Sequence, residues 1–379
     1  MRFLIGICII EALNTKLFYK KLILINLVIK LIIILNQNMT RLWNSNDDII
    51  NDMKNMKTFN KITKLIIHGK TNFNILPNKL TYLDCSNNQL SSLPTLPNTL
   101  IHLYCSNNQL SGLPNLPNTL THLYCSNNQL SSLPTLPNTL THLYCSINQL
   151  SSLPTLPNTL TYLCCNNNKL VSLSTLPDTL ISLNCQNNKL VSLPILPNEL
   201  QNLYCSNNKL SSLPTLSNKL AHLYCNNNQL LNLPNLPNTL TELRCLNNQL
   251  SSLPTLSNKL TYLCCNNNQL LNLPNLPNTL SYLYCNNNKL SSLPILPFTL
   301  KCMECSNNPF NLWSDLINST KINEDFAELI YEKLSVSNDQ VQELHNELNE
   351  NEWHDYNKKI GQLKKDIQSV LNAKYEIIL

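Results

Sequence analysis

Cysteine, histidine and tyrosine recur at fixed steps along this chain, and each of these side chains can do chemistry. A cysteine occurs every twenty residues from Cys85 to Cys305, twelve times in all. Histidine or tyrosine often stands three residues and one residue before it, as in the run of His102, Tyr104 and Cys105. Thiols and imidazoles at a regular spacing could bind a soft metal, form disulfides or supply a nucleophile. The elements that hold these residues decide among the three.

The chain repeats one unit of twenty residues over 80–305. Its pattern is Leu80-x-x-Leu83-x-Cys85-x-x-Asn88-x-Leu90-x-x-Leu93-Pro94-x-Leu96-Pro97-x-x. A sustained period of this length predicts a solenoid. Ordering the backbone of one unit costs about 20–40 kcal/mol, whereas burying each of its six or so apolar side chains contributes about 1.5–3 kcal/mol. A single unit therefore needs its neighbours in order to fold.

Each unit is expected to contain one short strand and one extended return. Residues 82–86 alternate in character, which predicts a strand with Leu83 and Cys85 facing the core and the residues between them facing outward. Pro94 and Pro97 then exclude a helix, because proline removes a backbone donor and drives its preceding residue toward extended geometry.

This pattern resembles the leucine-rich repeat family, whose signature is Leu-x-x-Leu-x-Leu-x-x-Asn-x-Leu. Here cysteine takes the third apolar place. The short unit with Leu-Pro-x-Leu-Pro is similar to a subclass found in bacterial secreted effectors, and similar asparagine-rich arrays occur in proteins of giant viruses of amoebae. The resemblance covers residues 80–310. It implies an α/β-type solenoid, a horseshoe with short parallel strands on the concave face and polyproline-like returns on the convex face.

The pattern divides the chain into five segments. Residues 39–79 are expected to form an N-terminal cap, in which residues 62–79 resemble a degenerate repeat, and residues 306–321 to form a C-terminal cap. The segments are 1–38 (apolar N-terminal segment), 39–79 (cap and degenerate repeat), 80–305 (array of about twelve repeats), 306–321 (cap) and 322–379 (helical hairpin or short coiled coil).

The first segment has two interpretations. The run "LILINLVIKLIIIL" at 22–35 is apolar, but Lys30 interrupts it and it is shorter than the roughly 20 residues of a spanning helix. It is either a membrane or signal-like segment or a mis-assigned start, with translation beginning at Met39.

In the last segment, 322–379, the twenty-residue repeat is replaced by a helical spacing of apolar residues. Trp353, Tyr356, Ile360, Leu363 and Ile367 follow steps of three and four residues, which favours helices. These helices are expected to dock a second partner or to self-associate.

The cysteine column is interpreted as a buried, reduced ladder. Cysteine packs as a small hydrophobe in protein cores, and the paired Cys-x-x-Cys spacing of metal sites is absent. Disulfides and soft-metal binding are the alternatives. Reduced thiols favour a reducing compartment, so we expect a cytoplasmic protein, with membrane anchoring as the alternative if residues 1–38 are retained.

An asparagine column accompanies the cysteines. Its amides are expected to satisfy backbone groups where each strand bends into its loop, as this column does in the family. Its members are Asn88, Asn108, Asn128, Asn148, Asn168, Asn188, Asn208, Asn228, Asn248, Asn268, Asn288 and Asn308.

The outward strand positions form two columns that are the candidate binding face. Tyrosine suits exposed strands for purely structural reasons, but it is also enriched in interfaces. Stacked histidines could share a metal only with difficulty, so we expect no metal and no cofactor. The candidates are Tyr82, His102, Tyr104, His122, Tyr124, His142, Tyr144, Tyr162, Tyr204, His222, Tyr224, Glu242, Arg244, Tyr262, Tyr282 and Tyr284.

A recent duplication favours recognition over simple packing. Residues 211–250 and 251–290 differ at eight positions, and five of these are outward sheet positions: 222, 224, 242, 244 and 246. The return segments did not change, although they also face solvent. We therefore expect a diversified recognition face, with Tyr104, Tyr124 and Tyr144 as its anchors.

Two classes of function follow. The first is a non-enzymatic recognition module or adaptor for a protein partner. Residues 80–305 carry 8 basic and 5 acidic residues without a basic stripe, which argues against nucleic acid. The second is a substrate-recruiting subunit of a ubiquitin-ligase-like assembly, or a glycan-binding repeat protein. The chain has no phosphate loop, Gly-x-Ser-x-Gly, His-Glu-x-x-His or Cys-x-Asp motif, so catalysis by the chain itself is not expected.

Overall fold

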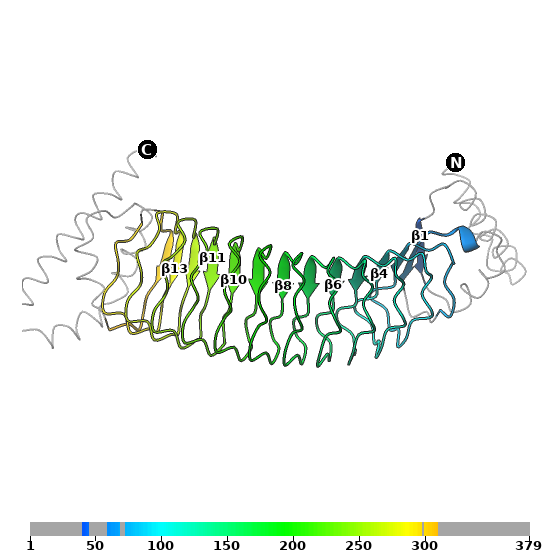
Figure 1. The fold of residues 1–379 in the computed structure, drawn as a ribbon, viewed down its shortest axis with the longest axis horizontal. Helices are drawn as coiled ribbons and strands as arrows, with labels where there is room; N and C mark the ends of the chain where they lie inside the picture. The colour runs from blue at the N-terminus through cyan, green and yellow to red at the C-terminus, as the bar shows by residue number, and fades with distance from the viewer. Residues whose placement is uncertain (1–39, 45–58, 69–72, 298, 310–379) are drawn as a thin grey trace, which may run out of the picture.

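The strands of this protein form one parallel sheet in sequence order. A computed structural model describes residues 40–44, 59–68, 73–297 and 299–309. Its fourteen strands run from β1 to β14, and each pairs with the next one in the chain (Figure 1). Because every connection returns to the neighbouring position, the chain winds as a solenoid, as predicted.

The strands are short and follow the repeat closely. The first elements are β1 (Thr40–Asn44), the 3-10 turn η1 (Phe59–Lys61) and β2 (Lys64–His68). The later strands are β3 (Tyr82–Asp84), β4 (His102–Tyr104), β5 (His122–Tyr124), β6 (His142–Tyr144), β7 (Tyr162–Cys164), β8 (Ser182–Asn184), β9 (Asn202–Tyr204), β10 (His222–Tyr224), β11 (Glu242–Arg244), β12 (Tyr262–Cys264), β13 (Tyr282–Tyr284) and β14 (Cys302–Glu304).

The register between strands equals the period of the sequence. Leu183 lies beside Leu163 on one side and Leu203 on the other, each twenty residues away. The same rule holds from β3 to β14, so equivalent residues of all repeats form straight columns. Strand β1 also pairs in parallel with β2, but at a different offset, with Thr40 beside Lys64. Residues 40–44 lack the repeat signature, and the sequence did not predict a strand there.

Several predictions concern residues outside this description. The apolar run at 22–35 and the helical segment at 322–379 lie outside the described residues. So do residues 310–321 of the predicted cap at 306–321, and residues 39, 45–58 and 69–72 of the predicted cap at 39–79. No α-helix occurs in the described ranges. These ranges therefore contain no helix that is long and apolar enough to cross a membrane.

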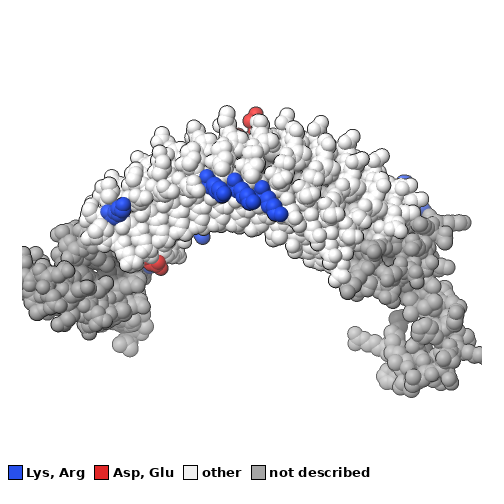
Figure 2. Space-filling model, turned by 90° about the horizontal axis from the view of Figure 1, so that it is seen from below, with Lys and Arg blue, Asp and Glu red and all other residues white. Residues whose placement is uncertain are grey.

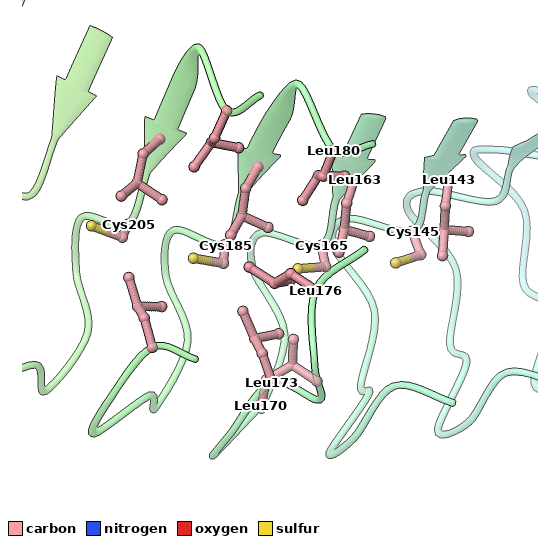
Figure 3. Close-up of a cluster of buried hydrophobic side chains, with 14 of the residues drawn as sticks. Leu143, Cys145, Leu163, Cys165, Leu170, Leu173, Leu176, Leu180, Cys185 and Cys205 are labelled. Atoms are coloured by element: carbon pink, nitrogen blue, oxygen red, sulfur yellow. The ribbon is translucent and has the colours of Figure 1, made fainter. Parts of the chain in front are cut away.

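The core consists of leucine and cysteine columns. Leu83 and Cys85 are fully buried, and the same two places are buried in every later repeat. Residues 82 and 84 remain half-exposed, so the predicted alternation is confirmed. Figure 3 shows the sulfur atoms of Cys145, Cys165 and Cys185 in a row beneath the strands.

The buried cysteines behave as apolar groups. Those from Cys85 to Cys285 in the core column are free thiols. Burial raises the pKa of the Cys125 and Cys185 thiols to about 12 and shifts the other core thiols in the same direction. A thiol that stays protonated at neutral pH is neither a good nucleophile nor a good metal ligand. The ladder therefore serves packing.

The asparagine column satisfies the backbone where the strand ends. The amide nitrogen of Asn168 donates to the carbonyl oxygens of Cys165 at 3.0 Å and Asn166 at 3.3 Å in its own repeat. It also donates to the Cys145 carbonyl at 3.1 Å, and its oxygen accepts from the Leu150 N–H at 3.0 Å. Each asparagine thus ties its loop to the preceding loop, as predicted.

The return segments are extended and rich in proline. They contain no helix or strand, which confirms the prediction from Pro94 and Pro97. Adjacent strands are held about 4.8 Å apart by ladder hydrogen bonds, whereas the returns contribute no strand to such a ladder. The solenoid bends into an arch (Figure 2). The more tightly spaced sheet is expected on its inner side.

A second asparagine column has a left-handed backbone that the sequence analysis did not predict. The residue before each asparagine of the first column has a φ between 52 and 58°. Asparagine tolerates this region better than most residues, so the recurring Asn-Asn pairs in the sequence could have predicted the left-handed backbone. Neighbouring side chains also bond to one another, as when Asn127 donates to the Asn107 oxygen at 2.8 Å.

Ile147 interrupts this second column and gives a stability prediction. It adopts a φ of 53° although it is β-branched, and its side chain is 51% exposed. Replacing Ile147 by Asn should raise the free energy of unfolding by about 1 kcal/mol, because it relieves left-handed strain and restores the amide chain. Urea unfolding measures this. Ile147→Val, which keeps the strain, should show no gain; equal stability of all three proteins would contradict the prediction.

Candidate binding face on the parallel sheet

The predicted site residues all lie on the outward surface of strands β3 to β13, here called the sheet face. Nearly all of them are half-exposed, and Tyr82 and Tyr104 show the usual pattern on either side of a buried leucine. The structure brings them together in two groups. Between these groups lie the small polar side chains of Ser182, Asn184 and Asn202.

The first group, the aromatic patch, is a double stack of rings. Tyr104 and Tyr124 stack with centroids 4.5 Å apart and an interplanar angle of 13°, and Tyr124 and Tyr144 with 4.5 Å and 6°. The imidazoles form a second stack beside the tyrosine stack. The patch comprises Tyr82, His102, Tyr104, His122, Tyr124, His142, Tyr144 and Tyr162.

The histidines stack on each other more than on tyrosine. His122 lies 4.2 Å from His142 and 4.6 Å from His102, measured between ring centroids. His142 continues the stack onto Tyr162 at 4.7 Å. The hydroxyl oxygen of Thr121 lies 2.7 Å from the His122 Nδ1 and orients its ring. In the described part of the chain, no three His, Cys, Asp or Glu side chains are grouped to hold a metal ion.

These imidazoles predict a dependence of stability on pH. Burial lowers the pKa of His102, His122 and His142 below the ordinary value, and for His122 the two neighbouring rings lower it further. The unfolded chain therefore binds more protons as the pH falls below about 6.5, and the melting temperature should fall from about pH 7.5 to about pH 5.

Thermal melts at both pH values test this, with a His102→Gln/His122→Gln/His142→Gln variant as the comparison. The variant should lose part of the pH dependence. The groups around the stack are the tyrosines of the aromatic patch, Asp84 in β3, and Lys64, whose Nζ lies 4.4 Å from the centroid of the Tyr82 ring. An unchanged pH dependence in the variant would contradict the prediction.

The second group, the charged patch, surrounds one carboxylate. Glu242 accepts hydrogen bonds from the Tyr224 hydroxyl at 2.6 Å and the Arg244 Nε at 2.7 Å, and its Oε2 lies 3.4 Å from the His222 Nδ1. The guanidinium of Arg244 lies over the rings of Tyr224 at 4.7 Å and Tyr262 at 4.6 Å. The charged patch comprises Tyr204, His222, Tyr224, Glu242, Arg244, Tyr262, Tyr282 and Tyr284.

This network holds its charges in place. Burial opposes ionisation of Glu242, but hydrogen bonds from Tyr224 and Arg244 outweigh it, so the pKa of the carboxyl lies below its usual range. Burial, and then the bond to Glu242, raises the pKa of Tyr224 to about 12. The sequence analysis placed these residues on one face but did not predict their contacts. The available signal was that Glu242 and Arg244 are two residues apart in a strand and share a face.

The comparisons with known proteins agree with this architecture. The family model described as Leucine Rich repeats (2 copies) matches residues 98–138. A structure of YopM from Yersinia pestis, described as a leucine-rich effector protein, is 36% identical; the match covers 62% of this chain and 74% of that chain, with a TM-score of 0.56. The chain is a leucine-rich repeat protein. Its repeats match the subclass of bacterial effectors, as the sequence predicted.

Further structures of this leucine-rich repeat type match. YopM from Yersinia enterocolitica is 36% identical over 65% of this chain, with a TM-score of 0.57, and this chain spans 61% of its length. The domain of InlJ from Listeria monocytogenes is 24% identical over 67% of this chain and 65% of that chain, with a TM-score of 0.53, and shares the fold; that domain is described as including a cysteine ladder. No curated protein matches the chain. The resemblance to giant-virus arrays stays a prediction.

Proposed function

We propose that this leucine-rich repeat protein is a non-enzymatic recognition module that binds a protein partner on its sheet face, with the aromatic patch as the main contact. The observation that carries this proposal is the continuous stack of Tyr104, Tyr124 and Tyr144. Tyrosine rings are enriched in interfaces because they bury a large area and lose little entropy on binding. Here the rings are already ordered by one another, which lowers that cost further.

The charge distribution supports a protein partner of mixed character. The aromatic patch has no Lys, Arg, Asp or Glu among its members. The charged patch, in contrast, offers a fixed Glu242–Arg244 ion pair, and its strand β11 lies about 50 Å along the sheet from the first strand, β1. Apolar contacts at one end would supply affinity, and a fixed ion pair at the other would set orientation. The duplicated block changed at residues 222, 224, 242 and 244, all on this face.

The similar proteins point the same way. The Yersinia pestis protein is described as an effector, and effectors act through other molecules. This chain covers only part of the length of these relatives, so their own partners are not transferred to it. The partner is defined by chemistry as a protein surface with apolar or aromatic side chains that fit the stacked rings.

The test replaces the three anchor tyrosines by a residue that the solenoid already accepts. Asn184 occupies the equivalent place in β8, so Tyr104→Asn/Tyr124→Asn/Tyr144→Asn should fold. Loss of even one hot spot costs about 2 kcal/mol, so the affinity for the partner should fall by about thirtyfold or more. Affinity capture from a cell lysate under reducing conditions, followed by titration of the captured protein, measures this.

A matched control lies on the opposite side. Ile195 is 89% exposed on a return, and Asn115 and Asn235 stand at the same place in other repeats. Ile195→Asn should bind as the unaltered protein does. Equal capture by the tyrosine variant would remove the aromatic patch from the function and leave its rings a packing role.

A further inference from the structure

A row of three lysines crosses one flank of the arch, away from the sheet face. Lys169, Lys189 and Lys209, here called the lysine row, occupy the same place in three successive repeats, and all are exposed. Figure 2 shows blue side chains side by side near the middle of the arch, on a flank that is otherwise almost free of charge. Most other repeats carry glutamine at this place, as at Gln149 and Gln229.

The lysine row carries an electrostatic cost that nothing nearby removes. Successive lysines lie one strand spacing apart, about 4.8 Å between backbones, and like charges at this distance repel each other. In the described ranges, ion pairs occur elsewhere, at Lys219 with Glu199 and at Arg244 with Glu242. No acidic side chain in those ranges neutralises the row. An anionic ligand bound there would relieve this repulsion.

Two exposed valines give the same flank an apolar strip. Val171 and Val191 are 55% and 58% exposed, two residues after the first two lysines of the row. Leu170 and Leu190 between them are buried, so the lysine and valine side chains emerge on one surface. Three cations beside two apolar groups fit an amphipathic helix with an acidic stripe better than they fit an inorganic anion.

The sequence contains such a stripe. Residues 339–355, here called the acidic segment, hold six acidic residues and no lysine or arginine. Glu343, Glu347 and Glu350 are spaced i, i+4 and i+7, so on a helix they would lie on one face over about 10 Å. The lysine row spans two strand spacings, about 10 Å. Leu344 and Leu348 would flank the glutamates on one side, as the valines flank the lysines.

We propose that the acidic segment docks as a helix on the lysine row of the same molecule, with its glutamates on the lysines and its leucines on the valines. The reach is sufficient. Lys209 lies five repeats before the end of the array, about 24 Å away, and residues 310–338 would span about 40 Å even if wound as a helix. Tethering raises the effective concentration of the acidic segment to about the millimolar range. The sheet face stays open, so this proposal does not depend on the proposed function.

Hydrogen exchange on the full chain tests the contact. In the variant Lys169→Gln/Lys189→Gln/Lys209→Gln, the amides of the acidic segment should exchange about tenfold faster or more, because docking protects them. Glutamine is the common residue of this column, so the array should fold. Lys289→Gln, in the same column but outside the row, should leave exchange unchanged. Equal exchange in the triple variant would overturn the proposal.

Charge reversal and cross-linking identify the partners. Reversal to glutamate at the lysine row, or to lysine at Glu343, Glu347 and Glu350, should each speed exchange, and the two together should restore protection. Carbodiimide treatment should link the lysine row to these glutamates within single molecules. In a mixture of isotopically light and heavy protein, links joining light to heavy chains would overturn docking within one molecule. Links from the acidic segment mainly to other lysines would overturn the site.

Discussion

Replacing Asn168 by leucine should lower the free energy of unfolding by about 1–3 kcal/mol, because it leaves a buried backbone donor without a partner. The three carbonyl oxygens that Asn168 contacts keep other donors: Asn148 also donates to Cys145, Asn188 to Cys165, and the Ile147 N–H to Asn166. The Leu150 N–H has no such substitute, since the Asn168 oxygen is the acceptor it uses. The cost is therefore set by one orphaned donor together with the lost link between two loops.

Urea unfolding followed by circular dichroism measures this change. Asn158→Ala is the matched control, since the Asn158 side chain is exposed on a return. The control should stay within about 0.5 kcal/mol of the unaltered protein. A stability of Asn168→Leu equal to that of the control would show that water or a shifted loop satisfies Leu150, and the structural role of the column would be wrong.

Replacing Leu183 by alanine should cost about 2–5 kcal/mol, because the side chain is fully buried and its removal leaves a cavity. Leu183 lies between Leu163 and Leu203, so the cavity weakens the contacts of one repeat with both neighbours. In a solenoid, stability is a sum of repeat and interface contributions. A weak repeat in the middle should therefore also make unfolding less cooperative.

The second prediction is checked by the midpoint and the slope of the same unfolding curve. The slope should fall together with the midpoint, because the two halves of the array begin to unfold separately. Ile195→Ala, at a side chain that is 89% exposed, should change neither. A loss below about 1 kcal/mol at Leu183 would mean that the neighbouring leucines close the cavity.

The sequence analysis was accurate where a property repeats. Identical units stack in register, so one alternation of Leu83 and Cys85 inward and Tyr82 outward describes every repeat. The same reasoning predicted the role of Asn168, because a half-buried asparagine after a strand bonds to the backbone around it. It also placed every candidate site residue on the sheet face, since residues two apart in a strand share a side.

Single departures from the repeat were predicted less well. The sequence analysis did not predict the contact between Glu242 and Tyr224, which depends on how two side chains on adjacent strands turn toward each other. It did not predict the left-handed backbone at Ile147 either, because the other repeats impose that conformation through loops tied to their neighbours. The stacking of His122 on His142 depends likewise on ring orientation.

The sequence by itself determined the solenoid, its parallel sheet, its buried thiols and the side on which the tyrosines and histidines lie, because a period of twenty places equal residues in equal surroundings. Only the tertiary structure decided which of those residues touch, how the imidazoles and phenols stack, and that no acidic side chain among the described residues pairs with the three lysines on one flank. The physical reason is that periodicity determines which positions become neighbours, whereas rotamers, backbone angles and unpaired charge depend on all the neighbours at once.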